Sequence, residues 1–217
     1  MTDARLPSLS AARPLLIFPY NGNALEASDG IGQEYRLIGF VDDTPGKHGQ
    51  DRHGRLVGSR ALFDLYPEAS VLAVHGSPTS YLQRGEITQG LGLDARLWAC
   101  VVHPRASVSP RATLGRNVTI MAGVYIASDV VIGDHVCVLP NTVIHHDAQV
   151  GDWSLIGSNV TIAGHTKVGR NCYIGSGSSL MNGILVGDRA LVGLATCVVR
   201  DVLPGRRLAG HPGHYVD

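Results

Sequence analysis

Residues 102–203 carry an aliphatic side chain at every sixth position. Starting at Val108, sixteen consecutive positions at steps of six residues fall on Val, Leu or Ile, with no insertion or deletion. A period of six matches neither the 3.6-residue repeat of a helix nor the two-residue alternation of a simple strand. It predicts a β-solenoid in which three hexads, each a short strand and a corner, form one coil, with the aliphatic side chains stacked inside.

Smaller side chains complete this pattern. Gly follows the aliphatic residue in eight of the sixteen hexads, and we expect these glycines to supply the backbone angles of the corners. The fourth residue after the aliphatic one is mostly small or β-branched, as at Ala112, Thr142 and Ser154. Each coil buries its apolar side only against its neighbours, so about five stacked coils can support themselves.

The first hundred residues have a different rhythm, in which apolar runs alternate with segments of helical character. This alternation predicts a small parallel α/β domain over residues 1–101, before the solenoid at 102–203 and a C-terminal tail at 204–217. The expected strands are Leu15–Phe18, Tyr35–Val41 and Val71–His75, and the expected helices are one from about Ala24, Arg60–Tyr66 and Tyr81–Gly90.

Ligands of such sheets bind at the carboxyl ends of the strands, which places Pro19–Asn23, Asp42-Asp43 and His75–Ser77 around one crevice. The first loop contains one glycine and no G-x-G-x-x-G, so the dinucleotide fingerprint fails. Asp42 could contact a ribose or a base there. The alternative is that the two aspartates open a polar turn with Pro45 and Gly46.

Composition excludes several classes of protein. Lys plus Arg and Asp plus Glu both total 18, and this balance argues against a nucleic-acid binder. No apolar stretch approaches the ~18 residues of a membrane span, and no basic leader precedes the first apolar run, so we expect a cytoplasmic protein. The four cysteines form no C-x-x-C pair and are expected to be reduced and inert.

Candidate chemistry gathers at one predicted corner. His145, His146 and Asp147 follow the inward-facing Ile144, and positions three hexads apart stack in one column. Gly164 therefore lies next to His146 and leaves open space, while His165 stacks on Asp147. An imidazole beside a carboxylate suits a general base. The alternative is an exposed polar corner, with His165 pairing structurally with Asp147 or Asp129.

The hexads resemble the left-handed parallel β-helix of the hexapeptide-repeat acyltransferases. The whole chain is similar to the NeuD and PglD family of sugar acetyltransferases, which joins a Rossmann-like nucleotide-sugar domain to an acetyl-CoA-binding β-helix. The similar segments are the linker at His103-Pro104, "GFVDD" at 39–43, Val143–Gly151 and the closing turn Gly210-His211-Pro212-Gly213.

This resemblance implies a homotrimer with active sites between neighbouring β-helices, an acetyl-CoA co-substrate and a nucleotide-linked amino sugar. Two features depart from the family. The loop "FPYNGNALEA" replaces the expected glycine-rich phosphate loop, and Leu155 stands where some members carry a polar side chain. The implied roles are general base for His146, orienting acid for Asp147, acetyl-CoA contacts for Gly164, Ser176 and Leu194, and substrate contacts for Asp42, Asn21 and His145.

The leading hypothesis is therefore an N-acetyltransferase in which the sugar amine attacks acetyl-CoA directly. A sugar O-acetyltransferase with the same base and a non-catalytic β-helix binding module remain alternatives. A zinc site is a further possibility, because some β-helix proteins that resemble the γ-class carbonic anhydrases bind zinc through histidines that include an H-x-x-x-x-H pair. No histidine pair in these repeats has that spacing, so we expect no metal site.

Overall fold

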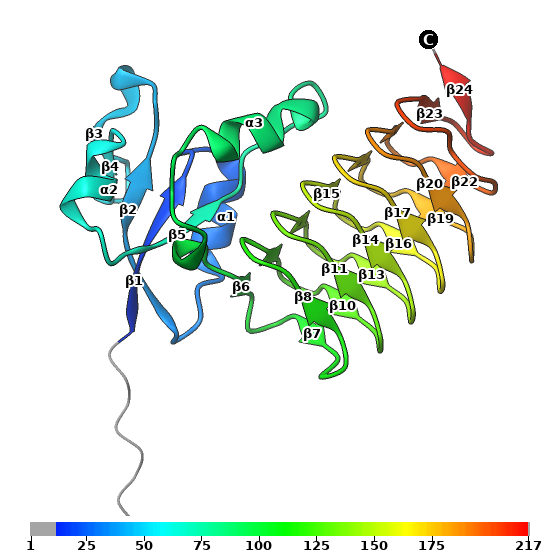
Figure 1. Cartoon of the computed structure of the whole chain (residues 1–217), viewed down its shortest axis with the longest axis horizontal. Helices are drawn as coiled ribbons and strands as arrows, with labels where there is room; N and C mark the ends of the chain where they lie inside the picture. Colours follow the sequence, from blue (N-terminus) through cyan, green and yellow to red (C-terminus); the bar gives the residue numbers. More distant parts are fainter. Residues whose placement is uncertain (1–11, 217) are drawn as a thin grey trace, which may run out of the picture.

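A computed structural model describes residues 12–216, in which a small α/β domain packs on a three-sided β-helix (Figure 1). The α/β domain contains a five-stranded sheet with the order β3-β4-β2-β1-β5, parallel except for the β3–β4 pair. Its elements are β1 Arg13–Phe18, α1 Gly22–Asp29, β2 Tyr35–Val41, the 3-10 turn Pro45–Lys47, β3 Gly49–Gln50, β4 Leu56–Gly58, α2 Ala61–Leu65, β5 Ser70–Ala73, the 3-10 turn Tyr81–Gln83, α3 Arg84–Gln89 and the 3-10 turn Ala95–Leu97.

Strand β1 lies between β2 and β5, and it is buried because its side chains are apolar on both faces of the sheet. Leu15 and Ile17 pack into one cluster and Leu16 into another, on the two faces of the sheet. The three expected strands are confirmed within two residues at each end. The expected helix at 81–90 is a 3-10 turn followed by α3, and the β3–β4 hairpin was not foreseen from the sequence.

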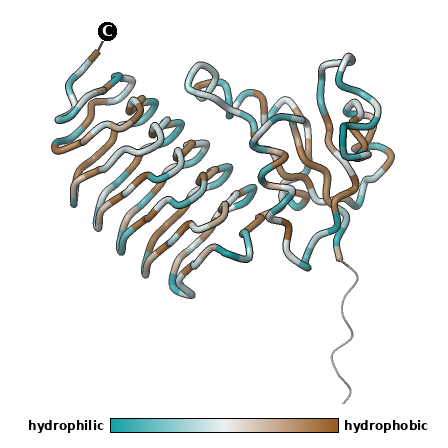
Figure 2. The backbone as a smooth tube through the Cα atoms, turned by 180° about the vertical axis from the view of Figure 1, so that it is seen from behind, coloured by the Kyte–Doolittle hydropathy of each residue, from teal (hydrophilic) through white to brown (hydrophobic). Residues whose placement is uncertain are grey.

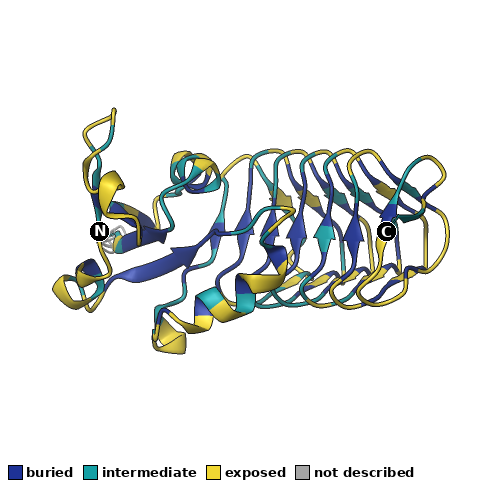
Figure 3. Cartoon of the chain, turned by 90° about the horizontal axis from the view of Figure 1, so that it is seen from above, coloured by how far each residue is buried: buried dark blue, intermediate teal, exposed yellow. Residues whose placement is uncertain are grey.

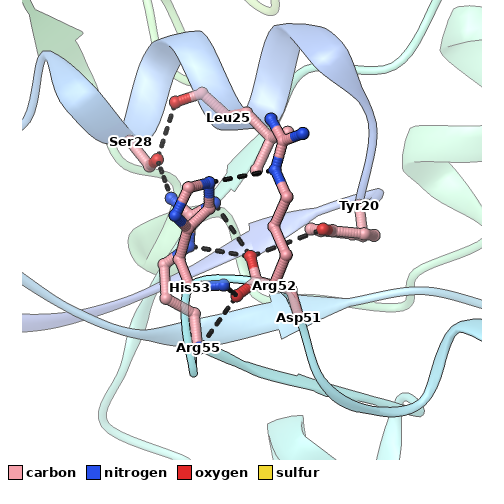
Figure 4. A network of polar contacts seen from close by, with 7 residues as sticks. All are labelled: Tyr20, Leu25, Ser28, Asp51, Arg52, His53 and Arg55. Atoms are coloured by element: carbon pink, nitrogen blue, oxygen red, sulfur yellow. Dashed lines mark hydrogen bonds and ion pairs between the residues drawn. The ribbon is translucent and has the colours of Figure 1, made fainter.

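Asp51 connects the β3–β4 hairpin to α1 (Figure 4). Its carboxylate accepts hydrogen bonds from the backbone N–H groups of His53 and Arg55 and pairs with the Arg55 guanidinium, which also donates to the Ser28 hydroxyl on α1. Burial alone would raise the pKa of Asp51, but these bonds outweigh it and lower the pKa to about 2. The Asp51–Arg55 pair therefore fixes the β3–β4 hairpin against α1.

The β-helix consists of two-residue parallel strands, and each strand pairs with the strand three hexads further along the chain, as in Tyr125 with Val143. This offset confirms the predicted coil, and the aliphatic hexad positions form one continuous core. Along the backbone, hydrophobic segments recur from coil to coil (Figure 2). The strands are β6 Val101–Val102, β7 Ser107–Val108, β8 Thr113–Leu114, β9 Thr119–Ile120, β10 Tyr125–Ile126, β11 Val131–Ile132, β12 Cys137–Val138, β13 Val143–Ile144, β14 Gln149–Val150, β15 Leu155–Ile156, β16 Thr161–Ile162, β17 Lys167–Val168, β18 Tyr173–Ile174, β19 Ser179–Leu180, β20 Leu185–Val186, β21 Leu191–Val192 and β22 Cys197–Val198.

The corners obtain their shape differently from what the sequence suggested. Every sixth residue from Asn117 to Ala195 has a positive φ, and it is the third residue after the aliphatic one, such as Asp147 at 59°. The glycines directly after the aliphatic residues serve the close approach of coils instead. A Cβ on Gly157 would lie 2.5 Å from the backbone nitrogen of Ser176 in the next coil. The expectation that these glycines form the corners was therefore wrong.

Residues 204–217, expected as a tail, contribute strands to the solenoid as far as the structure describes them. Strand β23 Arg207–Ala209 adds to β21 in parallel, and β24 His214–Val216 pairs with it in the antiparallel direction. The buried Leu208 extends the apolar core by one further layer. Among the described residues, no helix has the length and apolar character that a bilayer crossing requires.

One corner of the β-helix carries the α/β domain; we call it the interface corner (Figure 3). It consists of one residue per coil, each with a positive φ: Asn117, His135, Trp153, Asn171 and Arg189. Each contacts the α/β domain or the segment that leads to α3. For example, Asn117 Oδ1 accepts from the backbone N–H of Ala73, and its Nδ2 donates to the carbonyl of the same residue. The side-chain amide thus continues the edge of β5.

Arg84, at the start of α3, links the α/β domain to the β-helix at this interface. It is 1% exposed, and its guanidinium donates to the carbonyls of Trp153 at 2.9 Å, His135 at 2.6 Å and His75. The His135 and Trp153 rings stack at 5.5 Å, one coil apart. A buried guanidinium needs hydrogen-bond partners, and each of its three nitrogens donates to a carbonyl here, one from the α/β domain and two from the β-helix.

Candidate functional site

A second corner of the β-helix faces solvent and carries the candidate base; we call it the exposed corner, made of Asp129, His146, Asp147 and His165. His146 and Asp147 lie in the turn between β13 and β14. His146 Nδ1 is 2.8 Å from Asp147 Oδ2, and the two side chains are 56% and 46% exposed. The carboxylate fixes the proton on Nδ1, which leaves the Nε2 lone pair available to accept a proton from a ligand.

Gly164, in the next coil, determines where this imidazole lies. A Cβ at this position would lie 2.8 Å from His146 Cε1 and 2.9 Å from Nε2, so only glycine leaves room for the ring. The sequence predicted open space beside His146, and the imidazole itself fills that space. Gly164 therefore leaves the space in which the candidate base lies.

His165 completes the exposed corner from the coil above. Its Nε2 is 3.9 Å from Asp147 Oδ2, and its ring meets the His146 ring edge-on at a centroid distance of 5.1 Å. The expected pairing of His165 with Asp147 is thus confirmed at ion-pair distance. Asp129, the alternative partner, pairs with Arg111 at 3.6 Å instead.

The remaining predicted site residues do not all meet at this corner. His145 is exposed beside His146. Ser176 and Leu194 stack with each other at a third corner, where Leu194 is 68% exposed. Ser176 Oγ accepts from the backbone N–H of Ser158 at 3.0 Å. A single chain therefore presents His146 and the Ser176–Leu194 pair on different edges of the prism. Leu155 is buried under the α/β domain and contacts neither.

A cavity of 640 Å³ opens at the carboxyl ends of the strands in the α/β domain. Pro19, Asp42, Asp43 and His75 all line it, which confirms that these three predicted loops surround one crevice. Lys47, Arg60 and Glu86 add charge to its wall. Sequence reasoning missed these three because they lie in turns and short helices that carry no motif.

Asp42 and Asn21, both predicted substrate contacts, are engaged within the domain. The Asp42 carboxylate is 3% exposed and accepts from Tyr20 N–H, Thr44 N–H and the Lys47 ammonium at 2.8–3.0 Å. Burial would raise the pKa of Asp42, but the Lys47 and Thr44 bonds hold it below the usual value. Asn21 Oδ1 caps α1 by accepting from Ala24 N–H. These contacts favour the alternative in which Asp42 opens a polar turn.

His75 lies at the back of the cavity and joins it to the interface corner. Its Nε2 donates to the Arg84 carbonyl at 2.9 Å, and its buried Nδ1 has no partner among the described residues. Burial and the adjacent Arg84 cation lower the pKa of His75 to about 4, so the ring is neutral at pH 7. Sequence reasoning placed His75 near the crevice and gave it no role.

The cysteines show no sign of chemistry. Cys137 and Cys172 are buried, and burial raises the pKa of each thiol to about 11. A thiol of that kind is almost never ionised at neutral pH and is a poor nucleophile. All four cysteines are free, as expected.

The family comparison agrees with this architecture. The model "Bacterial transferase hexapeptide (six repeats)" matches residues 129–164, and "Hexapeptide repeat of succinyl-transferase" matches residues 165–193. A search of curated protein sequences gave no significant match. The two models meet at the exposed corner, so His146, Asp147 and His165 all fall within recognised hexapeptide repeats.

Solved structures match nearly the whole chain. The acetyltransferase domain of PglB from Neisseria gonorrhoeae FA1090, in complex with acetyl coenzyme A, has 22% identity and a TM-score of 0.82, over 94% of this chain and 100% of that one. PerB from Caulobacter crescentus, in complex with CoA and GDP-perosamine, has 24% identity and a TM-score of 0.81, over 96% and 99%. WeeI from Acinetobacter baumannii AYE has 17% identity and a TM-score of 0.79, over 94% and 100%.

These matches confirm the expected fold class, an α/β domain followed by a left-handed parallel β-helix. They cover both parts of the molecule and not only the repeats. The chain thus contains hexapeptide repeats and shares its two-domain fold with the acetyltransferase domain of PglB, with PerB and with WeeI.

Proposed function

We propose that this chain is an acetyltransferase that moves an acetyl group from acetyl-CoA to the amino group of a nucleotide-linked sugar. The observation that carries the proposal is the exposed His146–Asp147 pair, with Nδ1 and Oδ2 2.8 Å apart. Among the described residues, this is the histidine held by a carboxylate at hydrogen-bond distance with most of its ring open to solvent.

The chemistry follows from this geometry. A sugar amine attacks the thioester carbonyl carbon, the bond from carbon to sulfur breaks, and CoA leaves as the thiol. His146 Nε2 accepts the proton that the amine loses and passes it to the departing sulfur. Asp147 orients the ring and stabilises the imidazolium. A backbone N–H aimed at the thioester oxygen would stabilise the charge that develops there.

The acetyl-CoA contacts predicted for Gly164, Ser176 and Leu194 form the second part of the proposal. The Ser176 hydroxyl accepts one hydrogen bond and keeps its own proton free to donate, as far as the described residues show. Leu194 offers an exposed apolar surface that suits the methylene groups of a pantetheine arm. PglB and PerB were crystallised with acetyl-CoA and CoA, respectively, which supports the same donor here.

We place the nucleotide of the sugar substrate in the 640 Å³ cavity of the α/β domain. Lys47 and Arg60 supply positive charge, and each is more than two-fifths exposed despite its aspartate partner. Asp42 and Asn21 would shape the loop beside the nucleotide, and His145 would meet the sugar beside His146. PerB was crystallised with GDP-perosamine, a nucleotide-linked amino sugar, which supports this class of acceptor.

We further propose a homotrimer, because one chain carries its two predicted acetyl-CoA surfaces on different edges of the prism. A neighbouring copy would bring its Ser176–Leu194 corner to the His146 corner of the first. Tyr125, Val131 and Leu185 are exposed apolar side chains on the strands between the corners and could be covered in such an assembly. Light scattering after size-exclusion chromatography would measure the assembled mass.

The proposal is tested by incubating the full chain with acetyl-CoA and a panel of nucleotide-linked sugars. The panel pairs each amino sugar with the matching hydroxyl sugar, and release of CoA thiol and the product mass are followed. We expect transfer to amino sugars. Transfer to hydroxyl sugars alone would instead identify an O-acetyltransferase. Absence of acetyl-CoA binding in calorimetry would favour a non-catalytic module and overturn the proposal.

A further inference from the structure

We propose that the exposed corner binds a divalent transition-metal ion, preferably zinc, and that this ion switches off the His146 base. His146 and Asp147 would supply ligands from one coil and His165 from the next. Only the inhibitory part rests on the proposed function, because metal binding itself requires no acetyl transfer.

The three side chains already lie close to the geometry of a zinc site. One ligand atom from each lies within 4.8 Å of the other two. Both imidazoles approach the same oxygen, Asp147 Oδ2, with Nδ1 of His146 at 2.8 Å and Nε2 of His165 at 3.9 Å. Ligand atoms about 2.0–2.1 Å from a tetrahedral zinc ion lie roughly 3.3 Å from one another. The distances of 2.8 Å and 3.9 Å lie on either side of this value.

Small rotations can close the site because these side chains are largely exposed, and Gly164 beside the His146 ring carries no side chain of its own. His146, Asp147 and His165 are 56%, 46% and 65% exposed, so each can turn about χ1 without displacing a packed neighbour. Two imidazole nitrogens and one carboxylate oxygen form a donor set that suits zinc, whereas magnesium and calcium prefer oxygen alone. Water would take the fourth position, as in other three-ligand zinc sites.

Metal binding at Nδ1 would remove the basic lone pair of His146. A neutral imidazole has one lone pair and one N–H. When Nδ1 carries the proton and donates it to Asp147, the lone pair is on Nε2. When Nδ1 binds a metal ion instead, Nε2 must carry the proton and cannot accept another. The ion would also withdraw Asp147 from its orienting role.

We expected no metal site because the repeats contain no H-x-x-x-x-H pair, but that test does not cover residues that meet across coils. One full coil plus one position separates His146 from His165, and the two meet only because each coil stacks on the last. At the interface corner His135 has the same hexad position and nearly the same φ as His165, 62° against 60°. His135, however, lies between the Trp98 and Trp153 rings and has no access to an ion.

Calorimetric titration of the full chain with zinc chloride, without acetyl-CoA, tests the site. The diagnostic variants are His165→Asn and Asp147→Asn, because asparagine accepts the positive φ of these positions and keeps the fold. The matched control is His53→Asn, which removes an exposed histidine from the α/β domain. We expect both diagnostic variants to lower the zinc association constant at least tenfold, and the control to bind like the wild type. Equal affinity in wild type and His165→Asn would overturn the proposal.

The inhibitory part has its own readout. Zinc should reduce acetyl transfer by the wild type, EDTA should restore it, and magnesium should have no effect. In His165→Asn, half-inhibition should require at least ten times more zinc, relative to that variant's zinc-free rate. An unchanged rate at saturating zinc would overturn the inhibition. Tight zinc binding by a chain that transfers no acetyl group would sink the proposed function and leave the metal site standing.

Discussion

The interface corner and the exposed corner share one backbone conformation but differ in what surrounds them. Their turn residues have φ values near +60°, including His135 at one corner and His165 at the other. His135 is 9% exposed, and burial lowers its pKa, whereas the His165 side chain is 65% exposed. The repeat supplies identical positions, and the packing of the α/β domain decides which of them remain open for chemistry.

The two aspartates near the candidate sites show the same contrast. Asp42 is almost fully buried and accepts three hydrogen bonds from its own domain. Asp147 is half-exposed and pairs closely with a single imidazole. A carboxylate with all of its bonding capacity used holds a loop in place, while one with capacity to spare can orient a base. Substitutions at the two kinds of position should therefore affect different quantities.

The largest effect is expected for His146→Ala. Loss of a positioned general base typically costs two to four orders of magnitude in rate, and the exposed side chain contributes little to folding. The kcat for acetyl transfer should fall by about 10²–10⁴, with an unchanged unfolding midpoint. His103→Ala, a histidine elsewhere on the β-helix, serves as control in the same assay. Near-normal turnover by His146→Ala would remove this residue as the base.

Arg84→Met should have the largest effect at the interface corner, where it should lower the stability of the fold and not the rate of transfer. Methionine keeps most of the apolar stem of the arginine side chain but leaves three carbonyls without a hydrogen-bond donor. Each buried unsatisfied group costs about 1–3 kcal/mol, so we expect a loss of roughly 3–5 kcal/mol in the free energy of unfolding. Denaturant titration measures it. Arg96→Met, at an exposed ion pair, should change stability by less than about 0.5 kcal/mol.

His75 should make the stability of the interface depend on pH. A pKa that falls from 6.5 to about 4 on folding means that the unfolded chain binds more protons between these values. Stability is therefore full above pH 6.5 and is lost as the pH falls toward 4, by up to about 3 kcal/mol. The loss should be smaller in His75→Gln, with a remainder from His135, whose pKa burial also lowers. Identical pH profiles would contradict the buried neutral state of His75.

Asp42→Asn should destabilise the α/β domain by about 1–2 kcal/mol, because an amide cannot accept all three hydrogen bonds and loses the Lys47 charge pair. The unfolding midpoint of the full chain in denaturant would report it. Asp129→Asn is the matched control, since Asp129 is exposed and lies 3.6 Å from Arg111. Equal stability of the two variants would show that Asp42 is available for a direct ligand contact.

The repeat explains which parts of these sites could be foreseen. An uninterrupted six-residue period fixes the coil at three hexads, and arithmetic alone then places Gly164 and His165 beside His146 and Asp147. No such rule links α3 to the β-helix, so neither the role of Arg84 nor the burial of His135 was predictable. Asp42 was ambiguous because a turn and a ligand contact require the same residue. Only the Tyr20 and Lys47 contacts distinguish them.

The smallest effect, and the finest test of the exposed corner, is expected for Gly164→Ala. Gly164 has no positive φ, so alanine is tolerated by the backbone, but its Cβ would lie 2.8 Å from the His146 ring. The imidazole must rotate away, and we expect kcat to fall about tenfold, or roughly 1.4 kcal/mol, with little change in KM or stability. Gly32→Ala, where an added Cβ meets nothing within 4 Å, is the control. A Gly164→Ala variant with wild-type kcat would mean that the base works equally well from another position. The space that Gly164 leaves for the ring would then have no role in catalysis.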